Sequence, residues 1–387
     1  MLFFVVIGVL SMQYFRKEKQ MEHKGAKSHF FYFSLFCTLL MIIAAFRMVR
    51  RLGYGAIGGT DAPNYIHLFE ICNNSAWMNW TWLQHNDILF LYMNKLVRFF
   101  TGDYHVWFCF LYGFIAVSFV LFLKTFLLKK VEYIPCVLLI FIYWVGFNTI
   151  RSTTAYAFLM LALVLIFCKR TYVGICFAVA TLFVHKISFI YVGFIPFWLI
   201  FEKRDLNRKT IILMIVATSV FGIMVRSFFL AHFADADLGG AYQSYAKHAI
   251  GRSFFDNYWK ISFEQIVLAG AIFLLRKRMT LFSMQLDNVD KNRLRALYLM
   301  CAYDFMMIPM CFFMGAWRGY EMFYLPRIAM WCVVLQLVKI CYFSHNKCHF
   351  RTLCLICFIA WMIFRFRAIW QDAYLMPYVF EPLFNLL

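Results

Sequence analysis

Long apolar runs alternate with short polar connectors along the chain. A hydrocarbon core about 30 Å thick needs about 20 apolar residues per helix, so the runs predict about twelve membrane-spanning helices, within a range of about 10 to 14. Their centres fall near residues 8, 39, 114, 140, 160, 178, 194, 220, 269, 305, 336 and 360. The pattern predicts an all-α, polytopic integral membrane bundle, with residues 1–387 forming a single transmembrane domain.

The composition excludes a water-soluble fold. Hydrophobic residues make up 64% of the chain and charged residues 15%, against about 45–50% and about 25% in soluble domains. The mean hydropathy is +0.70. The 13 cysteines lie mostly inside apolar runs, where cysteine behaves as a small hydrophobe. Neither a disulfide framework nor a metal site is therefore expected.

The net charge of +19 bears on orientation, because the basic residues sit in short connectors. Basic residues follow the first apolar run at 16–19, which predicts that the N-terminus lies outside. With twelve spans, the C-terminus lies outside as well. Because the basic residues lie in connectors between membrane spans, the positive charge is not expected to bind nucleic acid. The predicted inner connectors hold 13 Lys and 9 Arg, and the outer segments 4 Lys and 11 Arg. Arginine is the better bidentate partner for phosphate. The surplus of arginine outside therefore indicates a site for an anionic substrate. The alternative is that it arises by chance in a small sample, together with arginines that anchor the protein to lipid headgroups.

Two long outer loops are predicted, at residues 47–105 and 231–262. In the first, four glycines lie between residues 53 and 59 and permit unusual backbone geometry. Asp61 followed by Pro63 predicts a helix start, with the Asp61 side chain as N-cap acceptor. This amphipathic helix would end at Cys72, and a second one is expected over 87–100. The second loop mixes charges with aromatic residues and is expected to form a lid or wall.

Three polar insertions between apolar runs are expected to meet on the outer side. They hold Arg151, then His185 to Ser188, and then residues 317–327 with Arg318 and Arg327. Together with Asp61, these side chains would suit a pyrophosphate-bearing substrate. The alternatives are that Arg151 and Arg327 reach lipid headgroups, that His185 caps a helix end, and that Arg318 pairs with Glu321.

Asp304 lies near the middle of a predicted span, where an unpaired charge is costly. It is expected either to form a structural pair with Arg226 or a tyrosine hydroxyl, or to belong to a proton or ion path.

Several of these motifs occur in an order similar to that of the EpsG-like, Wzy-type polysaccharide polymerases. The motifs are Gly59-Thr60-Asp61 with Tyr65, Arg151 at a polar break in an apolar hairpin, His185-Lys-Ile-Ser188 one hairpin later, and Met376-Pro377-Tyr378. The resemblance spans residues 29 to 380. This chain has Arg151-Ser152 where the family has Arg-Gln, and Asn86-Asp87 where it often has Glu-Pro. Ser188 also lies further from His185 than is usual.

The resemblance implies a membrane glycosyltransferase of the bacterial inner membrane, with a fold similar to GT-C-like enzymes. Its activity would be to join polyprenyl-pyrophosphate-linked repeat units on the periplasmic face, for O-antigen, capsule or exopolysaccharide. Its partners would be lipid-linked oligosaccharide and membrane lipids, together with a chain-length regulator and a flippase. A flippase of lipid-linked sugars and a membrane acyltransferase are the alternative functions.

In this scheme Arg151, His185 and Asp61 are the catalytic candidates, with Arg151 holding the pyrophosphate and Asp61 or His185 acting as base. The substrate-binding candidates are Arg318, Arg327, Tyr65, Tyr324 and Ser188. No cofactor or metal is required, and a divalent ion at Asp235 and Asp237 is the alternative.

Overall fold

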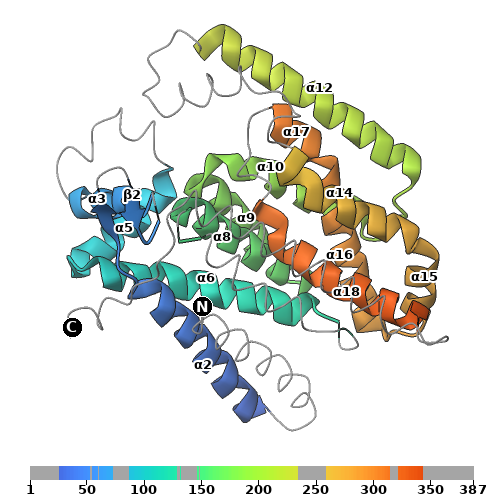
Figure 1. Cartoon of the computed structure of the whole chain (residues 1–387), viewed down its shortest axis with the longest axis horizontal. Coiled ribbons are helices and arrows are strands. Elements are labelled where there is room, and N and C mark those ends of the chain that lie inside the picture. Colours follow the sequence, from blue (N-terminus) through green and yellow to red (C-terminus); the bar gives the residue numbers. More distant parts are fainter. Residues whose placement is uncertain are drawn as a thin grey trace. The chain divides into compact units, whose positions relative to one another are not determined.

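The computed structural model describes nine stretches of the chain: residues 26–52, 55–59, 61–72, 87–128, 131, 146–147, 149–233, 259–313 and 321–342. Figure 1 shows the helices and strands along the chain, which divides into two compact units. Unit 1 comprises Met1–His185 and Leu335–Leu387, and unit 2 comprises Lys186–Val334.

Unit 1 is built around α6 (Tyr104–Phe126), which packs against α2 (Ala26–Ala45) and α8 (Ile150–Phe167). The last of these pairs closely with α9 (Thr171–Val184) in a helical hairpin. A methyl group in place of the Gly174 hydrogen would lie 2.5 Å from Ile166 Cγ1, so glycine permits this close approach. The shorter helices α3 (Ala62–Ile71) and α5 (Ile88–Phe100) pack on each other and on α6 (Figure 1).

A small hairpin precedes α3 and departs from the all-helical expectation. Strands β1 (Arg50–Leu52) and β2 (Gly55–Ile57) pair antiparallel, with Arg50 opposite Ile57. Gly58 follows with φ +80°, a conformation that non-glycine residues rarely adopt. A Cβ there would also lie 2.3 Å from the Met48 carbonyl oxygen. The glycine-rich stretch therefore supplies the unusual backbone geometry that was expected of it.

Unit 2 is helical throughout its described part. A 3₁₀ turn, η3 (Lys186–Ser188), leads into α10 (Phe189–Val192) and α11 (Phe194–Phe201), which are separated at Gly193. The hydroxyl of Tyr303 donates to the Ile190 carbonyl at this break, at 2.5 Å. The remaining helices are α12 (Arg208–Phe233), α14 (Trp259–Leu274), α15 (Arg276–Met284), α16 (Asn288–Met306), α17 (Ile308–Phe313) and α18 (Tyr324–Tyr342, in unit 2 as far as Val334).

Five helical segments in the described part are long and apolar enough to cross a membrane: 104–126, 150–167, 208–227, 288–313 and 321–338. Four shorter apolar segments lie at 33–45, 171–184, 186–201 and 262–274. These nine coincide with nine of the twelve predicted centres. The centres near 8, 140 and 360, both chain termini, and residues 234–258 of the second outer loop lie outside the described residues. Twelve spans, the likeness to GT-C enzymes and the orientation stay predictions.

Candidate functional site

Three polar side chains of unit 1 meet where a helical hairpin opens. Arg151 lies in the first turn of α8 and His185 caps the C-terminus of α9. Because the helices are joined by a tight turn, the start of the first lies beside the end of the second. Asp87 precedes α5, and α5 packs on α9. Two apolar helices and one surface helix thus bring a guanidinium, an imidazole and a carboxylate to one place.

The Asp87 carboxylate is the centre of this cluster. Its Oδ2 lies 3.0 Å from His185 Nδ1 and 3.5 Å from Arg151 Nε. The Asp87 side chain is 3% exposed, whereas those of His185 and Arg151 are 13% and 19% exposed. The carboxylate is therefore held inside the protein, whereas the side chains of its two partners are partly exposed.

Asp87 does not act as a helix cap. It occupies the N-cap position of α5 with extended backbone, yet its side chain makes no capping hydrogen bond. Asp103, at the equivalent position of α6, accepts from the His105 backbone N–H at 2.8 Å. The Asp87 carboxylate is thus directed toward Arg151 and His185, and its negative charge offsets that of the Arg151 guanidinium.

Asp61 begins α3 as predicted, with Pro63 in the first turn. The expected side-chain cap is wrong: Asp61 has helical φ and ψ of −87° and −18°, and its side chain makes no capping hydrogen bond. Its backbone carbonyl instead accepts from the N–H groups of Asn64 and Tyr65, at 3.1 and 3.2 Å. Tyr65 meets Phe90 of α5 edge-on, with ring centroids 5.9 Å apart. Asp61 and Tyr65 therefore lie on a helix packed against the one that Asp87 precedes.

Cys72 closes the same helix and packs with Leu91 and Leu68. Burial raises the pKa of the Cys72 thiol, and this effect outweighs the nearby Arg98 and Lys95, which lower it. The burial and the raised pKa favour the neutral thiol, which packs as a small apolar group. In the described part of the chain, no three His, Cys, Asp or Glu residues are grouped so as to hold a metal ion.

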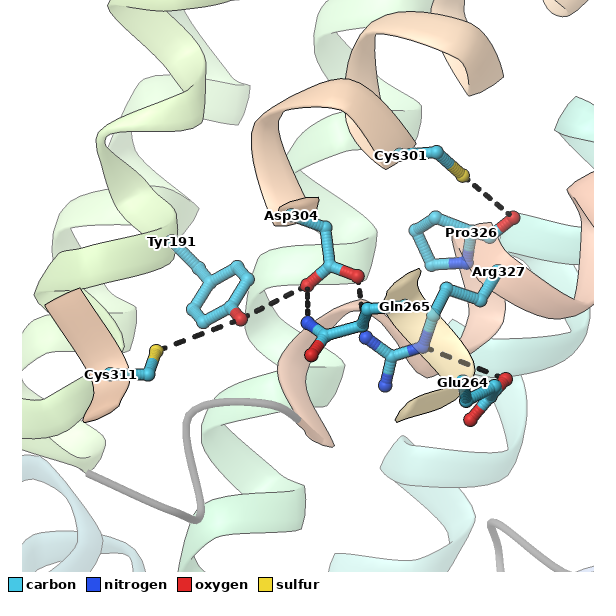
Figure 2. Close-up of polar contacts among 8 residues, drawn as sticks. All are labelled: Tyr191, Glu264, Gln265, Cys301, Asp304, Cys311, Pro326 and Arg327. Carbon is cyan, nitrogen blue, oxygen red and sulfur yellow. Dashed lines mark hydrogen bonds and ion pairs between the residues drawn. The ribbon is translucent and has the colours of Figure 1, made fainter. Parts of the chain in front are cut away.

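A second polar cluster lies inside unit 2 and is centred on Asp304 of α16 (Figure 2). Its Oδ1 accepts from the Tyr191 hydroxyl at 3.0 Å and from Gln265 Nε2 at 2.8 Å. Its Oδ2 accepts from Arg327 Nη1 at 2.5 Å. Arg327 Nε also lies 3.7 Å from Glu264 Oε1, and its guanidinium stacks on the Tyr324 ring at 4.5 Å.

This second cluster is closed to ligands in the structure. Arg327 and Asp304 are each 1% exposed, and Tyr324 is 6% exposed. Arg327 is held by two protein carboxylates, so it does not present a free cation to a substrate. Of the alternatives for Asp304, the structure shows a tyrosine hydroxyl partner, together with an arginine that was not expected. Arg327 and Tyr324 thus act in the interior of unit 2, a different setting from the substrate contact predicted for them.

Arg47, also counted among the predicted outer arginines, is buried in unit 1. It is 1% exposed and donates to the carbonyls of Ala44, Gly58 and Phe147 and to the Tyr112 hydroxyl. Its guanidinium lies 4.4 Å from the ring centroids of Phe108 and Phe147. The arginine surplus of the outer segments therefore includes side chains that hold the protein together.

The other candidates are placed as follows. Ser188 ends the 3₁₀ turn η3 and is fully buried. Arg318, Asp235, Asp237 and residues 376–378 lie outside the described part of the chain. Sequence reasoning missed Asp87 as a site residue, although it had noted that Asn86-Asp87 stands where related chains carry Glu-Pro. The signal available in the sequence was an acidic residue directly before an amphipathic helix, at a position where related chains carry Glu-Pro.

The apolar spans and the charged cluster at a hairpin end define a multi-pass membrane protein with a polar site. Comparison with known families gives the particular group: the EpsG family model matches residues 30–380, and the chain belongs to the EpsG family. The suspected family is thereby confirmed, and membership suggests a membrane protein of the polysaccharide polymerase type. No curated protein and no solved structure matches the chain.

Proposed function

We propose that this protein is a glycosyltransferase that polymerises polyprenyl-pyrophosphate-linked oligosaccharide repeat units on the periplasmic face of a bacterial inner membrane. The product would be O-antigen, capsule or exopolysaccharide. The proposal rests on family membership and on one observation, the Asp87 carboxylate between Arg151 and His185. A pyrophosphate leaving group and a hydroxyl acceptor need a cation and a base, and this cluster contains both.

In the proposed reaction, a hydroxyl oxygen of the incoming repeat attacks the anomeric carbon of the growing glycan. The bond from that carbon to the pyrophosphate oxygen breaks, and its electron pair leaves with the pyrophosphate. Arg151 binds the leaving group: its contact with Asp87 is made through Nε, so Nη1 and Nη2 can pair with phosphate oxygens. Holding developing charge with a fixed cation is an effective form of catalysis.

His185 receives the hydroxyl proton in this scheme. Asp87 holds Nδ1 at 3.0 Å, which fixes the ring and leaves Nε2, which is buried in the structure, as the nitrogen that would take the proton once the acceptor is bound. A carboxylate behind an imidazole also stabilises the imidazolium that forms on proton transfer. Asp61 is the alternative base, and Arg318 and Tyr65 stay proposed substrate contacts. Chain-length regulator and flippase partners are likewise part of the proposal.

The test is polymerisation in proteoliposomes from a purified lipid-linked repeat unit, with released polyprenyl pyrophosphate and glycan ladders as readouts. Arg151→Ala is expected to abolish both. The matched control is Arg170→Ala, at the closed end of the same hairpin and exposed. Ladders of wild-type length from Arg151→Ala, or no polyprenyl pyrophosphate from the wild-type protein, would overturn the proposal.

A flippase of the same lipid-linked sugars is the second candidate. It is favoured by two helix breaks in unit 2, at Gly193 and at Met307, near a buried carboxylate, because transporters use interrupted helices and charges at mid-membrane depth. It would move the lipid-linked unit across the vesicle membrane without releasing pyrophosphate. The same proteoliposomes therefore separate the two functions.

A further inference from the structure

Helix α5 exposes an apolar face that starts at the charged cluster. Its opposite side is buried against the rest of unit 1 through Phe90, Leu91, Asn94 and Val97, all of which are at most 8% exposed. Trp107 Nε1 donates to Asn94 Oδ1 on this buried side at 2.9 Å. Helix α5 is thus fixed in place, and its outer face is exposed.

The outer face is apolar, which is unusual for the exposed side of a surface helix. Ile88 is 45% exposed, Tyr92 and Leu96 are each 55% exposed, and Phe99 and Phe100 are each 77% exposed. Their spacing of three to four residues places them in one row, here called the apolar stripe. Lys95 is exposed beside it.

The length of α5 shows how the apolar stripe meets a lipid. Its 13 residues span about 20 Å at 1.5 Å per residue, which is too short to cross a hydrocarbon core of about 30 Å. The helix is therefore an interfacial element with an apolar side facing outward. What distinguishes it from an ordinary interfacial helix is its starting point, because Ile88 directly follows Asp87.

From this juxtaposition we infer that the apolar stripe binds the isoprenoid chain of the lipid-linked substrate. The inference rests on the proposed function. A polyprenyl pyrophosphate carries its charge at one end and is apolar from the next atoms onward. With the pyrophosphate on Arg151, the chain needs apolar contacts that begin within one residue of the cluster and continue away from it. The apolar stripe provides them for about 18 Å, from Ile88 to Phe100.

The variant that tests this is the double substitution Leu96→Ser and Phe99→Ser. Both side chains are exposed, so the fold and the charged cluster are not disturbed. The same glycan is offered on a long polyprenyl pyrophosphate and on a short, water-soluble isoprenyl pyrophosphate. We expect the KM for the long donor to rise about tenfold, with kcat and the KM for the short donor unchanged.

The control is Tyr172→Ser with Val173→Ser, in the first turn of α9. These side chains are 87% and 49% exposed and lie about 20 Å along that helix from His185. An equal rise in KM in the control would indicate general anchoring in the bilayer and overturn the inference, as would an unchanged KM for the long donor in the α5 variant. If the wild-type protein uses neither donor, the proposed function fails and the inference fails with it.

A photoreactive polyprenyl pyrophosphate gives a readout that does not depend on turnover. We expect it to label the α5 peptide, and we expect excess unlabelled polyprenyl pyrophosphate to suppress the labelling. Suppression to the same degree by excess phospholipid would identify the occupant as a bilayer lipid and overturn the inference.

Discussion

Replacing Asp87 with Asn tests how the charged cluster works. The substitution keeps the shape of the side chain but removes its charge, so neither His185 nor Arg151 retains an ionic partner there. No helix cap is lost, because the Asp87 side chain makes none. The amide can also offer its NH₂ group to Nδ1, which would hold the imidazole in the wrong tautomer.

The size of the effect follows from the geometry. The His185 contact, at 3.0 Å, is a hydrogen bond to a charged group, and the Arg151 contact, at 3.5 Å, is longer and weaker. A hydrogen bond to a charged group contributes about 1.5–3 kcal/mol. Losing the His185 bond alone therefore lowers kcat by about 10- to 150-fold. The KM for the donor should change little, because Arg151 stays in place to bind the pyrophosphate.

The assay is the proteoliposome reaction with polyprenyl pyrophosphate release as the rate. Asp103→Asn is the control, since Asp103 is also an N-cap aspartate of unit 1, and it is exposed and does cap its helix. Equal yields from the membrane fraction and matching size-exclusion profiles establish that both variants insert and fold. A wild-type kcat for Asp87→Asn, or an equal loss for Asp103→Asn, would refute the assignment of Asp87 as the residue that positions His185.

Three further predictions concern stability, each measured as a thermal unfolding midpoint in detergent. Gly58→Ala should lower the free energy of unfolding by at least about 1 kcal/mol, because alanine is strained at positive φ and its Cβ would meet the Met48 carbonyl. Gly270→Ala, with open space around it, is the control and should have no such effect. Equal midpoints for the two variants would refute the reasoning. Arg327→Met should lower the free energy of unfolding by about 3–5 kcal/mol, because it leaves buried carboxylates without their cation. Adding Asp304→Leu should recover part of that loss. A double variant that loses the sum of the two single losses would contradict this. Tyr303→Phe should lower the free energy of unfolding by about 1–3 kcal/mol, because the Ile190 carbonyl at the α10–α11 break loses the hydroxyl that donates to it. An unchanged midpoint would count against a stabilising role for this hydrogen bond.

The helices could be predicted because membrane spans depend on local composition. Nine predicted centres fall on described apolar helices, and the starts of α3 and α5 follow from Asp61 with Pro63 and from Asp87. The hairpin at Arg50–Ile57 was not predicted, because each of its two strands has only three residues. A strand that short shows almost no alternation of apolar and polar positions in the sequence.

The partners of the charged residues could not be read from the sequence. Arg151 and His185 were expected together, because the predicted topology places both polar insertions on the outer side. Arg47 and Arg327 lie in predicted outer segments like Arg151, yet both are enclosed by acceptors from distant parts of the chain. Whether an arginine faces a ligand or the interior depends on which helices pack, and the pattern along one helix does not determine that.

The buried network of unit 2 also constrains how this protein enters its membrane. Glu264, Asp304 and Arg327 belong to three different helices, α14, α16 and α18, and each would be costly to bury among apolar side chains without its partners. During synthesis the two carboxylates emerge before the guanidinium that balances them. We therefore expect α14 and α16 to stay in a protected setting until α18 has been made. We expect the three helices to pass into the lipid as a group, so a chain cut short before Arg327 would be recognised as incomplete by the quality-control proteases of the cell.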